Sequence, residues 1–252
     1  MQINFIIFIL FCFFNSVRAM SVAAVEAANR AATIKVGNSF IICRVDMAVG
    51  KREIVAYPCN RDTISDSQIT HALNNPSGDL YKYTGRIEYL DLSYCSKIAV
   101  LPDLRMLTKL KSFSVSNCEN LEALTGLPNL LQVLNLSYCP RLLNFSDGLL
   151  PTSLQYIFCI ECKSLTSFPA LNEYSELVRV DFTLCSSLER LPSLPASLEV
   201  LLICGARRLG KIPDLSVMCP KLRWFKIDDR SDSSIYYEAF NKDGVRELLK
   251  AL

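Results

Sequence analysis

The feature that most constrains this chain is a short apolar pattern that returns at a nearly fixed interval. The stretch LDLSYC at Leu90 to Cys95 has a near copy, LNLSYC, at Leu134 to Cys139. Aligned on the cysteine, the repeated positions are 95, 118, 139, 162, 185 and 206, so the successive steps are 23, 21, 23, 23 and 21 residues. A fixed period of this length is typical of chains in which similar structural units stack in a row.

Each copy places apolar residues at the same offsets on both sides of the cysteine position, although Ala206 replaces the cysteine in the sixth copy. A seventh copy begins at Leu222 and then fades. Over about Arg86 to Asp229 the pattern L-x-x-L-x-L-x-x-C resembles that of the leucine-rich repeat family. That resemblance implies an α/β solenoid, a leucine-rich repeat horseshoe with short parallel strands on its concave face. No repeat buries its apolar side alone, so stacking supplies the core.

The cysteines of the repeat are expected to be structural. The residue that follows each strand turns into the solenoid, where a hydrogen-bonding side chain meets backbone groups that the turn leaves unpaired. Many repeats use Asn there, whereas cysteine is smaller, apolar and a weak S–H donor. The pattern therefore predicts a buried ladder of thiols at Cys95, Cys118, Cys139, Cys162 and Cys185.

One pair of cysteines has the spacing of a different kind of site. Cys159 and Cys162 form a C-x-x-C, which elsewhere marks a redox pair or half of a zinc site. In the register of the repeat, however, Cys159 replaces an inward strand leucine and Cys162 belongs to the ladder. No second C-x-x-C follows, and His71 is the single histidine. We therefore expect neither a metal site nor a cofactor.

Two kinds of leucine-rich repeat are similar to parts of the chain. The block LDLSYCSKIAVLPDLRMLTKL, with CENLEAL, resembles the cysteine-bearing repeats of plant intracellular immune receptors. The block ERLPSLPASLEVLLI resembles the LP-x-LP-x-x-L repeats of exported effectors from bacterial pathogens. The sequence lacks the phosphate-binding G-x-x-x-x-G-K-[ST] of the first group and the catalytic C-x-D of the ubiquitin ligases in the second. The ligase activity is therefore not carried over.

The N-terminus differs from the rest of the chain. Phe5 to Phe14 is an apolar run, and Val17 and Ala19 fit the positions before a signal-peptidase cut. The run is shorter than the roughly 20 residues that cross a bilayer. The sequence thus predicts a signal peptide over 1–19 and a secreted protein with no stable membrane span afterwards. The positive charge that usually precedes such a run is missing, since no Lys or Arg stands before it. A buried strand is the other interpretation of the run. Translation from Met20 would instead give a cytoplasmic product.

The segment 20–85 is expected to cap the first repeat, because the end of a solenoid otherwise exposes its core. The Ala-rich Ser21 to Thr33 predicts a helix, and Phe40 to Asp46 with Glu53 to Tyr57 predict a hairpin. A capping-box spacing at Ser65 to Gln68 predicts a short helix that ends near Leu73.

The segment 230–252 is expected to cap the last repeat, with Asp243 capping a helix over Val245 to Leu252. Cys43 and Cys59 lie on opposite arms of the predicted hairpin. The sequence leaves open whether they form a disulfide.

A protein partner is expected on the concave face, where the strand residues outside the core face solvent. The first three repeats place mainly Ser, Asn and Asp there, and from the fourth repeat the face becomes apolar and aromatic. Contiguous apolar patches often mark interfaces, and aromatic residues beside Arg are common in binding hot spots. The predicted partner-binding residues are Tyr156, Phe158, Ile160, Arg179, Val200, Leu202 and Trp224.

Three alternatives for this patch remain open. In the first, the segment Ser231 to Phe240 folds back over the patch. In the second, a slipped register in the fourth repeat buries part of the patch. In the third, the patch is the interface of a homodimer. Two sequons, at Asn135 and Asn144, add a further constraint. A glycan on Asn135, added in a eukaryotic secretory pathway, would crowd the concave face.

The charge pattern argues against nucleic acid as the partner. The net charge is +2, from 27 Lys and Arg against 25 Asp and Glu, with no long run of one sign. Phosphate recognition requires clustered positive charge. No nucleophile, acid and base converge at a useful spacing, so no catalytic residue is expected. The sequence favours an exported, effector-like protein-binding module, with an immune-receptor-like fragment in recognition or defence signalling as the alternative.

Overall fold

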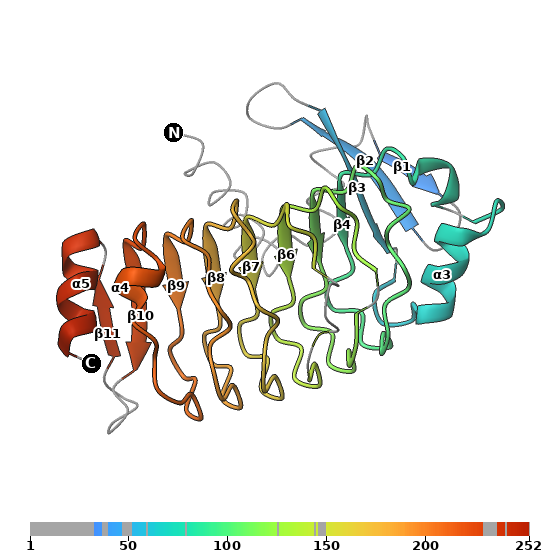
Figure 1. Cartoon of the computed structure of the whole chain (residues 1–252). Coiled ribbons are helices and arrows are strands. Elements are labelled where there is room, and N and C mark those ends of the chain that lie inside the picture. The colour runs from blue at the N-terminus through green and yellow to red at the C-terminus, as the bar shows by residue number, and fades with distance from the viewer. Residues whose placement is uncertain are drawn as a thin grey trace.

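The computed structural model describes residues 33–36, 40–46, 52–58, 60–78, 80–124, 126–143, 145, 150–228, 236–239 and 241–251. These residues form one eleven-stranded sheet in which the strands follow one another in chain order (Figure 1). The predicted signal peptide, nearly all of the Ala-rich helix, the hairpin turn, Cys59 and Asn144 lie outside the described residues.

Seven short strands, one from each copy of the repeat, pair in parallel at equivalent positions. For example, Leu90 lies beside Phe113, which lies beside Leu134. The chain is therefore a parallel-strand β-solenoid of about six turns. The strands are β4 (Tyr89–Asp91), β5 (Ser112–Ser114), β6 (Val133–Asn135), β7 (Tyr156–Phe158), β8 (Arg179–Asp181), β9 (Val200–Leu202) and β10 (Trp224–Asp228).

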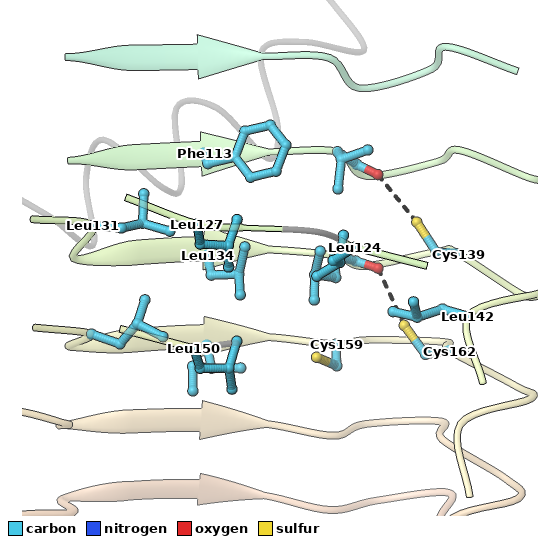
Figure 2. Packing of buried hydrophobic residues seen from close by; sticks show 14 of the residues in the cluster. Phe113, Leu124, Leu127, Leu131, Leu134, Cys139, Leu142, Leu150, Cys159 and Cys162 are labelled. Carbon is cyan, nitrogen blue, oxygen red and sulfur yellow. Dashed lines mark hydrogen bonds between the residues drawn. The ribbon is translucent and has the colours of Figure 1, made fainter. Parts of the chain in front are cut away.

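The leucines of successive turns stack into one continuous core (Figure 2). Leu131 and Leu134 in one turn and Leu154 and Ile157 in the next are fully buried. Because paired strands lie about 4.8 Å apart, residues at the same offset contact one another from turn to turn. In the described residues between β4 and β9 the connections are turns and contain no helix, so the helix content is low.

Each turn reverses direction through a residue in the left-handed conformation, directly before the cysteine position. An L-residue other than glycine costs roughly 1–2 kcal/mol there, whereas glycine adopts the conformation freely. The residues and their φ angles are Tyr94 (65°), Asn117 (58°), Tyr138 (62°), Glu161 (58°), Leu184 (62°) and Gly205 (78°).

Asp or Asn at the end of a strand stabilises the start of that turn. The side-chain oxygen accepts a hydrogen bond from the backbone N–H two residues later, which forms an Asx turn. The bonds run from Ser93 N to Asp91 (2.9 Å), from Ser137 N to Asn135 (3.1 Å) and from Thr183 N to Asp181 (3.1 Å). In these three repeats the residue that ends the strand also begins the turn.

The N-terminal segment adds three antiparallel strands to the solenoid. These are β1 (Thr33–Val36), β2 (Phe40–Asp46) and β3 (Arg52–Pro58), and β3 pairs in parallel with β4. The predicted hairpin is thus confirmed. The predicted short helix is also confirmed as α3 (Asp66–Asn74), with the capping box at Ser65, and a 3-10 helix η1 (Tyr81–Tyr83) follows it.

At the C-terminal end, α4 (Leu215–Met218) precedes β10, and β11 (Tyr236–Ala239) pairs with β10 in antiparallel orientation. The described part of the tail therefore continues the sheet at its edge. The last helix, α5 (Lys242–Ala251), begins earlier than predicted. The prediction that Asp243 caps this helix is wrong. Asn241 takes that role, because its side chain accepts a 2.8 Å hydrogen bond from Gly244 N.

Asp66 fastens α3 to the first repeat. Its carboxylate accepts hydrogen bonds from Ala99 N and Val100 N, each at 3.1 Å. We expect Asp66→Ala to lower the free energy of unfolding by about 1–2 kcal/mol, because both N–H groups lose their acceptor. Urea denaturation measures this loss. Asp62→Ala, at an exposed carboxylate four residues away, is the control, and an equal loss in both variants would contradict the assignment.

Candidate functional site

The structure brings the predicted partner-binding residues together on the open face of the sheet, the face opposite the interior core. The register expected from the repeat is present in the fourth copy, so the slipped-register alternative is wrong. Two adjacent rows form a surface that we call the stripe. One row contains Tyr156, Arg179, Val200 and Trp224, and the other contains Phe158, Asp181, Leu202 and Lys226. Ile160 lies just beyond the end of β7.

Most of the apolar residues in the stripe are buried, which corrects the expectation that they face water. Tyr156 and Phe158 are each 4% exposed, Val200 is 8% exposed and Leu202 is 7% exposed. Tyr156 and Phe158 pack with Val133 in an apolar cluster that is separate from the interior core. Side chains on paired strands lie close enough to cover one another, an effect that a column of exposed positions does not reveal.

Arg179 connects the aromatic residues of the stripe. Its Cζ atom lies 5.2 Å from the ring centroid of Phe158 and 5.2 Å from that of Trp224, which is the geometry of a cation–π contact on both sides. Its Nη2 donates a 3.0 Å hydrogen bond to Asp181, whose side chain is almost fully buried. The buried Nε of Arg179 has no hydrogen-bond partner within the described part of the chain. Arg179, Ile160 and Trp224 remain partly exposed.

Glu238 on β11 completes the stripe at its C-terminal end. Trp224 Nε1 donates a 3.0 Å hydrogen bond to Glu238, and Lys226 Nζ lies 3.6 Å from the other carboxylate oxygen. Glu238 was not among the residues predicted for the partner surface, although it lies in the segment Ser231 to Phe240, which was one alternative for covering the patch. The two aromatic residues Tyr236 and Tyr237, a residue type that is common in strands, are a signal that could have suggested this strand.

The open face over β4 to β6 has a different chemistry. Its hydroxyl and amide groups bond to one another, from Ser93 to Ser114 (2.8 Å) and from Asn135 to Ser114 (3.2 Å). Arg61, from the loop after β3, donates to Asp91 at 2.8 Å and to the Ser93 carbonyl. The amide of the Asn135 sequon is therefore engaged within the fold. The polar groups named here therefore already have partners within the fold.

The structure places all five cysteines of the expected ladder in the interior, fully buried. Four of the thiols donate to a backbone carbonyl of the preceding turn, and Figure 2 shows two of these bonds. In each case the acceptor lies three residues before the preceding ladder cysteine. The bonds join Cys118 to Leu92 (3.3 Å), Cys139 to Val115 (3.1 Å), Cys162 to Leu136 (3.2 Å) and Cys185 to Cys159 (2.7 Å).

These thiols are poor nucleophiles. Burial raises the pKa of Cys95 and of Cys139 from the ordinary value of 9.0 to about 12. Contact with the thiol of Cys159 and burial raise the pKa of Cys162. Contact with the thiol of Cys162 and burial raise the pKa of Cys185. A thiol acts as a nucleophile or a metal ligand in its deprotonated form, which this environment disfavours.

The C-x-x-C pair lies within the same buried column. Cys159 and Cys162 are both free thiols, as are the other cysteines whose side chains the structure describes. Among the described residues, no group of three or more His, Cys, Asp or Glu side chains is arranged to hold a metal ion. The possible Cys43–Cys59 disulfide involves side chains outside the described residues.

The fold and these two sites define a β-solenoid with an internal thiol ladder and an aromatic stripe on its open face. No protein-family model matches the chain, and no curated protein matches it either. Within the part of the chain that the structure describes, the helices are all too short or too polar to span a bilayer.

Proposed function

We propose that this chain is a leucine-rich repeat protein with no catalytic role, and that it binds another protein through the stripe on its concave face. The repeat period, the buried offsets and the parallel strands support the leucine-rich repeat assignment. The observation that carries the binding role is the aromatic cluster that is separate from the interior core.

The interior core does not need this cluster. The inward leucines close the solenoid from turn to turn, and over β5 the open face carries Ser112 and Ser114 at the equivalent strand positions. A polar open face is therefore compatible with the fold. Aromatic and apolar residues on the same face of β7 to β10 favour a partner surface.

Within the stripe, the partly exposed residues are the ones that a partner would meet first. Trp224 and Arg179 belong to the residue types that dominate binding hot spots, and Ile160 adds an apolar contact at the end of β7. Phe158 and Leu202 are buried, and the ring of Phe158 contacts Arg179, so these two residues support the exposed ones. We assign contact to Ile160, Arg179 and Trp224, and support to Tyr156, Phe158, Val200 and Leu202.

The binding proposal is tested with the full chain carrying a C-terminal tag, used for affinity capture from a lysate of its source organism and of that organism's host. The variant Ile160→Asp/Trp224→Ala changes two partly exposed stripe residues. Leu130→Asp/Val217→Asp changes two exposed apolar residues elsewhere and is the control. We expect a protein that wild type and control retain, and that the stripe variant binds at least about tenfold more weakly in a titration with the purified partner.

Circular dichroism and thermal unfolding of all three proteins must match before the comparison is made. Retention of the same partner by the stripe variant, with unchanged affinity, would sink the assignment of the stripe as the binding surface. Loss of the partner in the control alone would place the interface at Leu130 or Val217.

We further propose that the protein is exported and effector-like. The apolar run at Phe5 to Phe14 and the LP-x-LP-x-x-L block at Leu191 to Leu198 support this. The C-terminally tagged chain is expected in the culture medium, in a form shorter than its precursor. Deletion of 2–19 is expected to keep it inside the cell, and a wild-type chain that remains inside at full length would contradict export.

A further inference from the structure

A surface hollow of about 510 Å³ lies beside the turns that follow β5, β6 and β7. It shares no residue with the stripe, so it is independent of the proposed protein interface. Its volume is within the range of roughly 300–1,000 Å³ that small-molecule sites occupy. The lining residues are Asn117, Glu119, Asn120, Tyr138, Pro140, Arg141, Glu161 and Lys163.

Three of the lining residues hold the left-handed conformation that the turn requires. Asn117, Tyr138 and Glu161 have φ angles of 58°, 62° and 58°, and none of them is buried. Gly205 occupies the equivalent position in the sixth repeat, so glycine fits this turn with less strain. Tyr94 and Leu184 hold the same conformation and are also exposed, so the conformation belongs to the turn itself, and what distinguishes Tyr138 is that it lines the hollow.

The charges of the hollow balance. Glu119 and Glu161 oppose Arg141 and Lys163, and Lys163 Nζ lies 3.9 Å from the Glu161 carboxylate. The hollow therefore has no net charge that would select an anion or a cation. Its carboxylates, amides and cations nevertheless offer hydrogen-bond acceptors and donors side by side.

Tyr138, which is 37% exposed, supplies the aromatic part of the hollow. The hollow thus combines an aromatic ring with hydrogen-bonding side chains whose charges cancel. This combination suits a ligand that has both apolar C–H faces and hydroxyl groups. We propose that the hollow binds a neutral oligosaccharide, which stacks one sugar ring on Tyr138 and bonds its hydroxyls to the residues of the neighbouring turns.

Isothermal titration calorimetry of the full chain with maltotriose, cellotriose and chitotriose tests this proposal. We expect at least one of these neutral trisaccharides to bind. Tyr138→Gly should weaken that binding about tenfold or more, because the stacking face is lost, without lowering the free energy of unfolding. Tyr138→Asn, which also tolerates the conformation, is the second variant. Tyr94→Gly is the control, since Tyr94 has a φ of 65° and is exposed but lies outside the hollow.

The proposal fails if none of the three sugars binds to wild type. It also fails if Tyr138→Gly and Tyr138→Asn bind the sugar as wild type does, or if Tyr94→Gly weakens binding by the same factor. A charged peptide that binds with dependence on Tyr138, when no sugar binds, would assign the hollow to a protein ligand instead.

Discussion

The solenoid is expected to unfold as the pH rises from 9.0 towards about 12, the interval that separates the ordinary thiol pKa from that of Cys95 and Cys139 in the fold. The folded state keeps the proton on a buried thiol in this interval, whereas the unfolded chain loses it. Folding stability from these thiols is therefore fully present below pH 9.0 and is lost as the pH approaches about 12.

The expected size of this effect is large because several thiols act together. One such group lowers the free energy of unfolding by about 1.4 kcal/mol per pH unit within the interval. Three of them, at Cys95, Cys118 and Cys139, give about 4 kcal/mol per unit, and burial is the main cause of each raised pKa. A domain of this kind has a total stability of roughly 5–15 kcal/mol, so unfolding should occur inside the interval.

Urea denaturation at a series of pH values, followed by circular dichroism under reducing conditions, measures the slope. Cys139→Ser isolates one thiol, because a hydroxyl does not titrate here and still donates to the Val115 carbonyl. We expect its slope to be shallower than that of wild type by about 1.4 kcal/mol per pH unit. Lysine and tyrosine titration affects both proteins equally. Identical slopes in the two proteins would show that the thiol of Cys139 does not contribute to the pH dependence of the free energy of unfolding.

A second large effect is expected from two adjacent leucines. Leu131 is fully buried in the core, whereas Leu130 is 56% exposed. Leu131→Ala should lower the free energy of unfolding by about 3 kcal/mol, since it removes apolar contacts and leaves a cavity between stacked turns. Leu130→Ala should change it by less than about 0.5 kcal/mol. Denaturation of the two variants in urea compares them directly, and similar losses would contradict the register of this repeat.

The period predicted the strand positions well, because inward residues repeat at fixed offsets and the strands pair at those offsets. Leu90, Phe113 and Leu134 are aligned in the sequence and lie side by side in the sheet. The capping box at Ser65 and the hairpin were also predictable, since both depend on local sequence. The α5 boundary was misplaced because Asn and Asp are both good helix caps, and Asn241 precedes Asp243.

The burial of the stripe could not be predicted in the same way. A repeat alignment shows which residues point away from the core, but it does not show how those side chains cover one another. Arg179 on β8 contacts the ring of Phe158 on β7 and that of Trp224 on β10, two strands away. Glu238 reaches Trp224 from outside the repeat. Contacts of this kind depend on side-chain conformations that have no fixed spacing in the sequence.

The antiparallel strand at the C-terminal edge of the sheet has a consequence for assembly. A parallel turn presents the same hydrogen-bonding groups to the next turn, so a stack of identical turns could in principle grow without limit. Here β11 runs antiparallel to β10, whereas β1, after two antiparallel pairings through β2 and β3, runs in the same direction as β4. A turn from a second copy that approached β11 would therefore meet a strand of opposite direction. The reversal at this edge opposes polymerisation into a fibre.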